Sequence, residues 1–205
     1  MKRVLTIALG VAVFSGCNNS EKSQKDSDGS KIGTKDTTVT ADNGPVAELS
    51  HTFSNVDPKL ATSLQIIVAD YLQTKNSLID NSGHDAATGG KAMAEAISKL
   101  DKSLFTPEQK KIYDGIEGDL KENAEHIGKS GGDIAHQREH FSMMSEDVYD
   151  LVKAFGGGQI LYHDRCPMAN DQKGAMWLSE TREVKNPYFG GKMNECVTVQ
   201  EVIKK

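Results

Sequence analysis

The chain has 205 residues, which is enough for one ordinary domain with a sizeable core. Its formal net charge is −5 at pH 7, and a mildly acidic chain lacks the basic surface that nucleic-acid binding requires. We therefore expect a single domain that does not bind nucleic acid.

The N-terminus has the pattern of a lipoprotein signal peptide. Lys2 and Arg3 precede an apolar run over residues 4–14, and the small residues 15–16 stand directly before Cys17. The apolar run is shorter than the about 20 residues that a membrane-spanning helix needs. We predict a signal peptide over residues 1–16, with cleavage before Cys17 and a lipid on its thiol. Ordinary secretion and an uncleaved anchor are the alternatives.

A polar segment follows Cys17. Residues 18–44 hold only three hydrophobic side chains, Ile32, Val39 and Ala41, and cannot bury enough apolar surface to become ordered. We predict a flexible tether over residues 17–50 and a folded domain over residues 51–205. The mature protein would be anchored to a membrane of the cell envelope, in the periplasm or at the outer membrane.

Two helices are predicted in the first half of the domain. The first begins at Asp57-Pro58, a capping side chain followed by proline at the first helical position, and should end near residues 81–83. The second spans about residues 85–102. Its apolar face is weaker, because Gly89-Gly90 lies inside it and lowers helix propensity, so we expect a kink there.

Two further helices have stronger signals. Thr106, Pro107 and Gln109 form a start with a capping box, and this helix should continue to Gly131-Gly132. Asp133 begins a fourth helix, which ends at the three glycines that start at residue 156. Its apolar face comprises Ile134, Phe141, Met144, Val148, Leu151 and Phe155. Four amphipathic helices with short connections predict a mainly α fold, an antiparallel four-helix bundle.

The C-terminal segment is rich in loops. Residues 159–162 and 197–202 each favour a short strand, and together they predict a small hairpin at one end of the bundle. Trp177, Tyr188 and Phe189 are large aromatic residues that we expect to anchor the segment on the helices.

Sulfur side chains gather in the same segment. Cys166 lies two residues before Met168, and Met193 lies three residues before Cys196. Thiolate and thioether sulfurs are soft donors that suit Cu(I), so the two pairs could hold one soft metal ion if they converge. A disulfide between Cys166 and Cys196, or a packing role, is the alternative. The disulfide would close a loop of about thirty residues and stabilise the fold by about 3–4 kcal/mol.

Three further candidate ligands lie on the fourth predicted helix. His136, His140 and Met143 follow the spacing i, i+4 and i+7, which places them on one face beside the apolar stripe. They either pack as a polar flank of the helix under the C-terminal segment, or they are ligands whose side chains point toward the sulfur pairs. His126, late in the third helix, could join them from a neighbouring helix.

The C-terminal motifs resemble those of a known family. The chain resembles an uncharacterised-domain family in three motifs. Two of them are CPMA-x4-GA-x-WLS and NPYFG-x-KM-x2-C, and the third, upstream, is HQREHFSMMSEDVYDLVKAFG. Its members are small envelope lipoproteins or are attached to periplasmic copper and silver efflux adaptor proteins. The resemblance covers residues 57–203 and implies a connection to copper, with an efflux or envelope protein as a partner. Val197 departs from the glycine that follows the last cysteine in the family.

Two functions from different classes follow. The first is a lipid-anchored protein that binds a soft metal ion, Cu(I), for sequestration or transfer. Its primary ligands would be Cys166 and Cys196, and its secondary ligands Met168 and Met193. Residues 136, 140 and 143 would form an adjoining set. The second is a helical interaction module stabilised by a disulfide, without a metal. An enzyme is not indicated, since no nucleophile triad, phosphate-binding loop or paired-carboxylate motif stands out.

Overall fold

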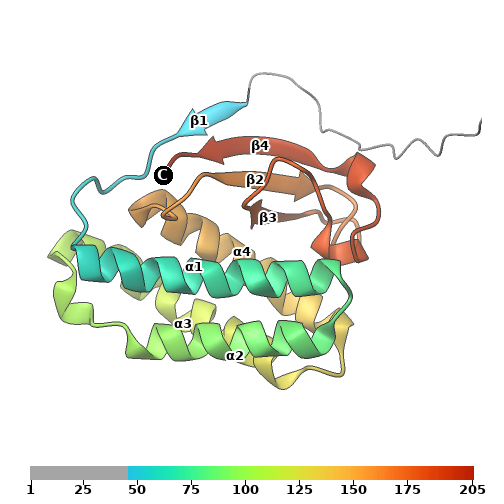
Figure 1. The fold of residues 1–205 in the computed structure, drawn as a ribbon, viewed down its shortest axis with the longest axis horizontal. Helices are drawn as coiled ribbons and strands as arrows, with labels where there is room; N and C mark the ends of the chain where they lie inside the picture. Colours follow the sequence, from blue (N-terminus) through green and yellow to red (C-terminus); the bar gives the residue numbers. More distant parts are fainter. Residues whose placement is uncertain (1–45) are drawn as a thin grey trace, which may run out of the picture. The chain divides into compact units, whose positions relative to one another are not determined.

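The computed structural model describes residues 46–205, which form a mainly α unit with a small sheet in its C-terminal part (Figure 1). The predicted signal peptide, Cys17 and the tether up to residue 45 lie outside the described residues. The α-helices of the described part are α1 Pro58–Ile79, α2 Gly83–Lys99, α3 Pro107–Lys129 and α4 Ile134–Phe155. Four predicted helices are therefore confirmed.

Capping side chains explain where the helices begin. Asp57 accepts hydrogen bonds from the first backbone N–H groups of α1, and the capping box of Thr106 and Gln109 is complete at α3. The Asp133 side chain accepts from the backbone of residue 136 at the start of α4. Helix α2 begins two residues earlier than predicted, because Ser82 supplies its N-cap.

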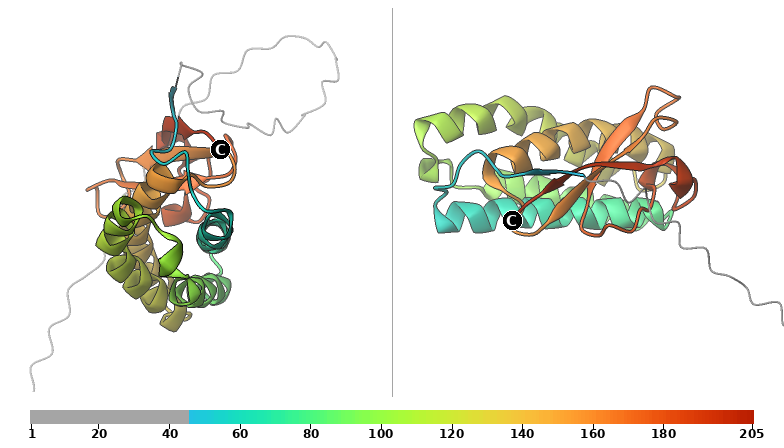
Figure 2. Two further views of the ribbon diagram at one scale, coloured as in Figure 1. Left: turned by 90° about the vertical axis from the view of Figure 1, so that its left-hand side faces the viewer. Right: turned by 90° about the horizontal axis from the view of Figure 1, so that it is seen from above.

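The helices pack in the order of the chain. Each of α1, α2 and α3 contacts the helix that follows it, and α1 also contacts α4. Seen end-on, the helices surround a common interior and the sheet covers one side of them (Figure 2). None of the helices among residues 46–205 combines the length and apolar character needed to cross a membrane.

The C-terminal segment forms three strands of a sheet that is larger than the predicted hairpin. The strands of this sheet are β1 Ala47–Leu49, β2 Leu161–Cys166, β3 Ala175–Ser179 and β4 Thr198–Ile203. Their order is β1-β4-β2-β3, with β1 parallel to β4 and the other pairs antiparallel. The two predicted strands do pair, as β2 and β4, but β3 joins the free side of β2. Strand β1 also brings residues 47–49, predicted as the end of the tether, into the fold.

Aromatic side chains join the sheet to the helices. Phe141 of α4 stacks on Tyr71 of α1, with ring centroids 5.2 Å apart, and contacts Tyr188 at 5.8 Å. Trp177 of β3 is fully buried and meets Tyr188 edge-on. The anchoring predicted for Trp177 and Tyr188 is confirmed, and Phe189 is partly buried against the same core.

The glycines that weaken α2 locally are points of close helix contact. A Cβ atom on Gly89 would lie 2.4 Å from the Thr74 hydroxyl oxygen of α1. A Cβ atom on Gly90 would lie 2.7 Å from the Ala124 carbonyl oxygen of α3. Helix α2 runs through both positions without a break, so the predicted kink is wrong. The absence of side chains lets α2 approach both neighbours.

We expect Gly90→Ala to lower the free energy of unfolding by about 1–3 kcal/mol, because the added methyl group overlaps backbone atoms that cannot move aside cheaply. Gly115→Ala is the matched control. A Cβ atom there meets nothing within 4 Å, so the better helix propensity of alanine should raise stability by about 0.5–1 kcal/mol. Urea unfolding measures both, and a stabilising Gly90→Ala would place the close approach of α2 and α3 elsewhere.

Candidate functional site

The two predicted cysteine ligands meet in the structure. Cys166, the last residue of β2, and Cys196, thirty positions later, have Sγ atoms 3.0 Å apart, and both are free cysteines. Cys166 is buried and Cys196 half-buried. Burial, followed by the neighbouring Cys166 thiol, raises the pKa of Cys196 to about 11. This pair, which we call the thiol pair, therefore has a protonated Cys196 at neutral pH when no metal displaces the proton.

Local backbone structure fixes Cys196. It ends a short 3₁₀ helix, η3 Asn194–Cys196, and its thiol donates to the Met193 carbonyl oxygen at 2.9 Å. The Asn194 side chain ties η3 to the preceding turn by accepting from the backbone N–H of Asn186 and donating to a backbone carbonyl. Val197, which follows Cys196, has a φ of −90°, so this position does not require glycine.

Met168 and Met193 line a pocket beside the thiol pair. The pocket has a volume of about 510 Å³ and also contacts Arg138 and Glu139 of α4 and Tyr188 of the 3₁₀ helix η2 Pro187–Phe189. Met168 is exposed, at 46% of its surface. The predicted secondary ligands thus share one cavity, although neither cysteine lines it.

The predicted helix-four histidines meet a third histidine. Among residues 46–205, His126 of α3 and His136 and His140 of α4 are the one group of three His, Cys, Asp or Glu residues whose ligand atoms gather, all within 4.8 Å of one another. The rings of His126 and His140 stack with centroids 4.2 Å apart, and His136 meets His140 edge-on at 4.5 Å. We call this group the histidine trio. All three side chains are half-buried.

Asn123 holds His140 in place. Its Oδ1 atom lies 2.9 Å from Nδ1 of His140. An amide oxygen only accepts hydrogen bonds, so Nδ1 carries the proton and the lone pair remains on Nε2. Burial lowers the pKa of His140, and His126 and His136 lower it further. His140 is therefore a neutral imidazole at neutral pH, which is the form that binds metals.

An acidic groove adjoins the histidine trio. It has a volume of about 410 Å³. Its lining residues are Asp119, Glu122, Asn123, His140, Met143, Glu146 and Asp147. Burial, followed by the neighbouring carboxylates of Asp119, Asp150 and Glu146, raises the pKa of Asp147 to about 6. Met143 lines this groove with His140 and is 47% exposed. The groove attracts cations toward the trio.

The predicted ligands therefore form two groups. From the sequence, one alternative was that His136, His140 and Met143 lie close to the sulfur pairs. In the described part of the chain, no hydrogen bond links the histidine trio to the thiol pair, and no third His, Cys, Asp or Glu ligand joins the cysteines. The histidines face α3, whereas Ala135, Arg138 and Glu139 of the same helix line the methionine pocket.

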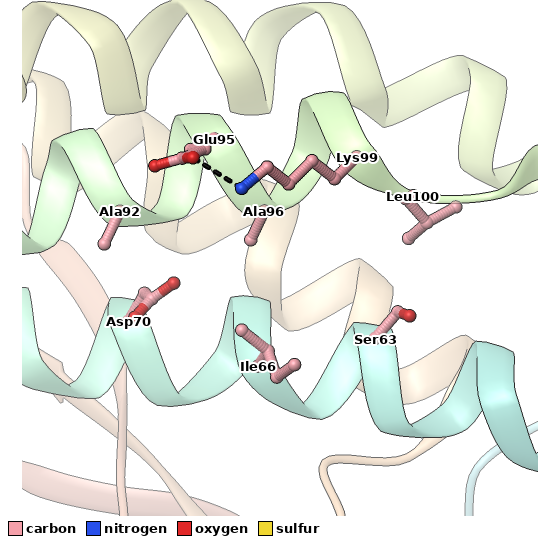
Figure 3. Close-up of a pocket in the computed structure, with 8 residues that line it drawn as sticks. All are labelled: Ser63, Ile66, Asp70, Ala92, Glu95, Ala96, Lys99 and Leu100. Carbon is pink, nitrogen blue, oxygen red and sulfur yellow. Dashed lines mark hydrogen bonds and ion pairs between the residues drawn. The ribbon is translucent and has the colours of Figure 1, made fainter.

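Another cavity lies between α1 and α2 (Figure 3). It measures about 310 Å³, and the small side chains Ala92 and Ala96 leave room opposite Ile66. Glu95 is paired with Lys99 on the same helix, which leaves Asp70 as the remaining carboxylate. One free carboxylate beside apolar side chains does not make a metal site, so we place the function elsewhere.

Comparison with known proteins gives one family match. A family model described as a protein of unknown function, DUF3347, matches residues 67–159. The matched segment contains all three members of the histidine trio and ends before β2, so it does not reach Cys166 or Cys196. The resemblance seen in the sequence extended to residue 203, and the match does not include its C-terminal motifs. No curated protein and no solved structure matches the chain.

His126 was named from the sequence as a residue that could join the helix-four set, and helix packing brings its ring to theirs. Asn123, which contacts His140, was not singled out from the sequence. Asn123 lies three residues, about one turn, before His126 on α3, a spacing that puts both side chains on one face. That spacing was visible in the sequence, but its meaning depended on which helix lies opposite.

Proposed function

We propose that this protein is a lipid-anchored protein of the cell envelope that binds a soft metal ion, Cu(I), through Cys166 and Cys196, for sequestration or transfer to an efflux or envelope partner. The observation that carries the proposal is the 3.0 Å contact between two free thiols from distant parts of the chain. Thiolates are the side chains that suit Cu(I) best.

The surroundings of the thiol pair support a soft ion. The half-buried position of Cys196 leaves access from solvent, whereas Cys166 is buried beneath it. Two thiolates so close together repel each other, and a cation between them removes the repulsion. Met168 and Met193 supply thioethers in the adjacent pocket, where a soft ion can be received or passed on. We also infer an antiparallel order for the four helices, since their short connections favour it.

The test is a Cu(I) titration of the full chain under reducing conditions, against a chromophoric Cu(I) chelator. We expect one Cu(I) ion to be retained by the thiol pair. If the protein takes no Cu(I) from this chelator, even when the chelator is one of low Cu(I) affinity, the proposal is refuted.

The second candidate is the interaction module with a Cys166–Cys196 disulfide. The same contact favours it, because two thiols this close need little movement to be oxidised in an oxidising compartment. Titrating thiols in protein isolated from the envelope, with and without reductant, separates the candidates. Free thiols favour metal binding, and a disulfide that persists favours the interaction module.

The lipid anchor has its own test. We expect Cys17→Ser to release the protein from the membrane fraction, because the apolar run over residues 4–14 is too short to anchor the chain by spanning. Cell fractionation and immunoblotting measure the change, with Cys166→Ser as the control that should remain on the membrane. Membrane association that survives Cys17→Ser contradicts the lipoprotein assignment.

A further inference from the structure

The histidine trio has the features of a metal site in its own right. Imidazole nitrogens are borderline donors that suit divalent Zn and Cu, in contrast to the soft sulfurs of the thiol pair. Three nitrogen ligand atoms within 4.8 Å of one another can be satisfied by one ion between them. Three protein histidines with an open fourth position form a known type of zinc coordination.

The local structure presents these nitrogens together without a metal. Asp133 caps α4 and fixes its start, and His136 and His140 project from the first two turns of this helix, one turn apart. The turn between α3 and α4 is short, so His126, in the last turn of α3, lies opposite the first turns of α4. The stacking of His126 on His140 shows that the two helices hold the rings at contact distance.

The support around the trio is of the kind that orients metal ligands. A ligating histidine usually donates its other ring N–H to a fixed oxygen, as His140 does to Asn123. Glu139 lies 3.5 Å from Nδ1 of His136, and Glu122 lies 3.8 Å from Nε2 of His126. Glu122 also lines the acidic groove, which leads to His140.

We propose that His126, His136 and His140 form a second metal site, separate from the thiol pair, for a divalent first-row transition ion. Among these ions Cu²⁺ binds most tightly to such donors, and Zn²⁺ is also suited to imidazole ligands. The acidic groove raises the local concentration of cations at the site. The protein thus offers a nitrogen site and a sulfur site to ions of different softness. This site goes beyond the proposed function, since its ligands are imidazoles of α3 and α4 and not the thiols of Cys166 and Cys196.

The first test is a Zn²⁺ titration of the full-length Cys166→Ser/Cys196→Ser variant, in which the thiols cannot take up the ion, followed by NMR of the imidazole Cε1–H signals. The chain has six histidines, so their signals can be assigned by single substitutions. We expect three signals, those of the trio, to shift together and saturate at one ion. His84 is the internal control, because it is 92% exposed and its signal should stay in place. Shifts spread over all six histidines, or none, overturn the proposal.

The second test measures affinity in a Cys166→Ser/Cys196→Ser background, so failure of the thiol pair and failure of the trio remain distinguishable. His126→Ala and His140→Ala should each weaken Zn²⁺ binding at least about a hundredfold, and Asn123→Ala about tenfold. His84→Ala is the matched control and should leave the affinity unchanged. Equal effects of His84→Ala and His140→Ala would mean that the trio is an ordinary cluster of surface imidazoles.

A folding defect would show itself in the same variants. Each is first unfolded by heat in a chelator, where trio substitutions on a half-buried surface should shift the midpoint by only a few degrees. Zn²⁺ at a hundred times its dissociation constant should then raise the unfolding midpoint of the parent protein, which is the Cys166→Ser/Cys196→Ser variant. It should not raise the midpoint of the same variant with His140→Ala. A parent midpoint that does not respond to Zn²⁺ contradicts the site, whatever the variants do.

Discussion

Replacing Cys166 or Cys196 by serine should lower the Cu(I) affinity by more than about a hundredfold, because a hydroxyl oxygen is a poor donor for a soft ion. Since the two Sγ atoms lie 3.0 Å apart, either substitution leaves the ion with a single thiolate at this place. The double variant should bind no more Cu(I) than a peptide without cysteine. Competition with a Cu(I) chelator under reducing conditions places all variants on one scale.

The controls separate the sulfur site from the histidine trio. Met168→Leu and Met193→Leu should each weaken Cu(I) binding by about tenfold or less, since a neutral thioether contributes no charge and leucine keeps the apolar volume. His136→Ala and His140→Ala should leave Cu(I) affinity unchanged, because their rings gather with His126 and not with the thiols. If the double cysteine variant binds Cu(I) as tightly as the natural chain, the metal proposal for the thiol pair fails.

Phe141→Ala should have the largest effect on stability, lowering the free energy of unfolding by about 3–5 kcal/mol. The ring is fully buried, stacks on Tyr71 and contacts Tyr188, so its removal opens a cavity between α4, α1 and the C-terminal segment. Chemical denaturation followed by circular dichroism measures the loss. A change below about 1 kcal/mol would mean that the ring is not at the centre of the core.

Ile112→Ala is the matched control for Phe141→Ala. Ile112 lies on α3, and its side chain is 39% exposed. Its truncation should therefore cost about 1 kcal/mol or less, since most of the surface that it loses was already in water. A large loss at Ile112 would show that something covers this side of α3.

The pattern of helices was predictable because its causes are local. Caps at Asp57, Thr106 and Asp133 and glycines after α4 determine where helices begin and end within a turn of the chain. The apolar face of α4 was likewise readable, and Phe141 and Val148 are fully buried as predicted. These features need no knowledge of what lies opposite.

The sheet was only partly predictable because strand pairing joins distant segments. The run that forms β3 follows a loop and has no clear alternation, and its strand character comes from pairing with β2. Strand β1 pairs with β4 across the length of the domain, so a segment of three residues, too short to form a strand by itself, becomes part of the fold. The glycines of α2 gave the opposite error, since their low propensity was evident and the neighbours that require them were not.

The candidate site divides along the same line. The sequence alone determined which side chains can bind metals, and the helical period put His136 and His140 on one face of α4. Only the tertiary structure decided that Cys166 meets Cys196 and that His126 completes the trio. The physical reason is that a ligand group is defined by distances of a few ångströms between atoms on different elements. Those distances depend on how α3 packs on α4 and how β2 lies beside η3, which no local pattern in the chain encodes.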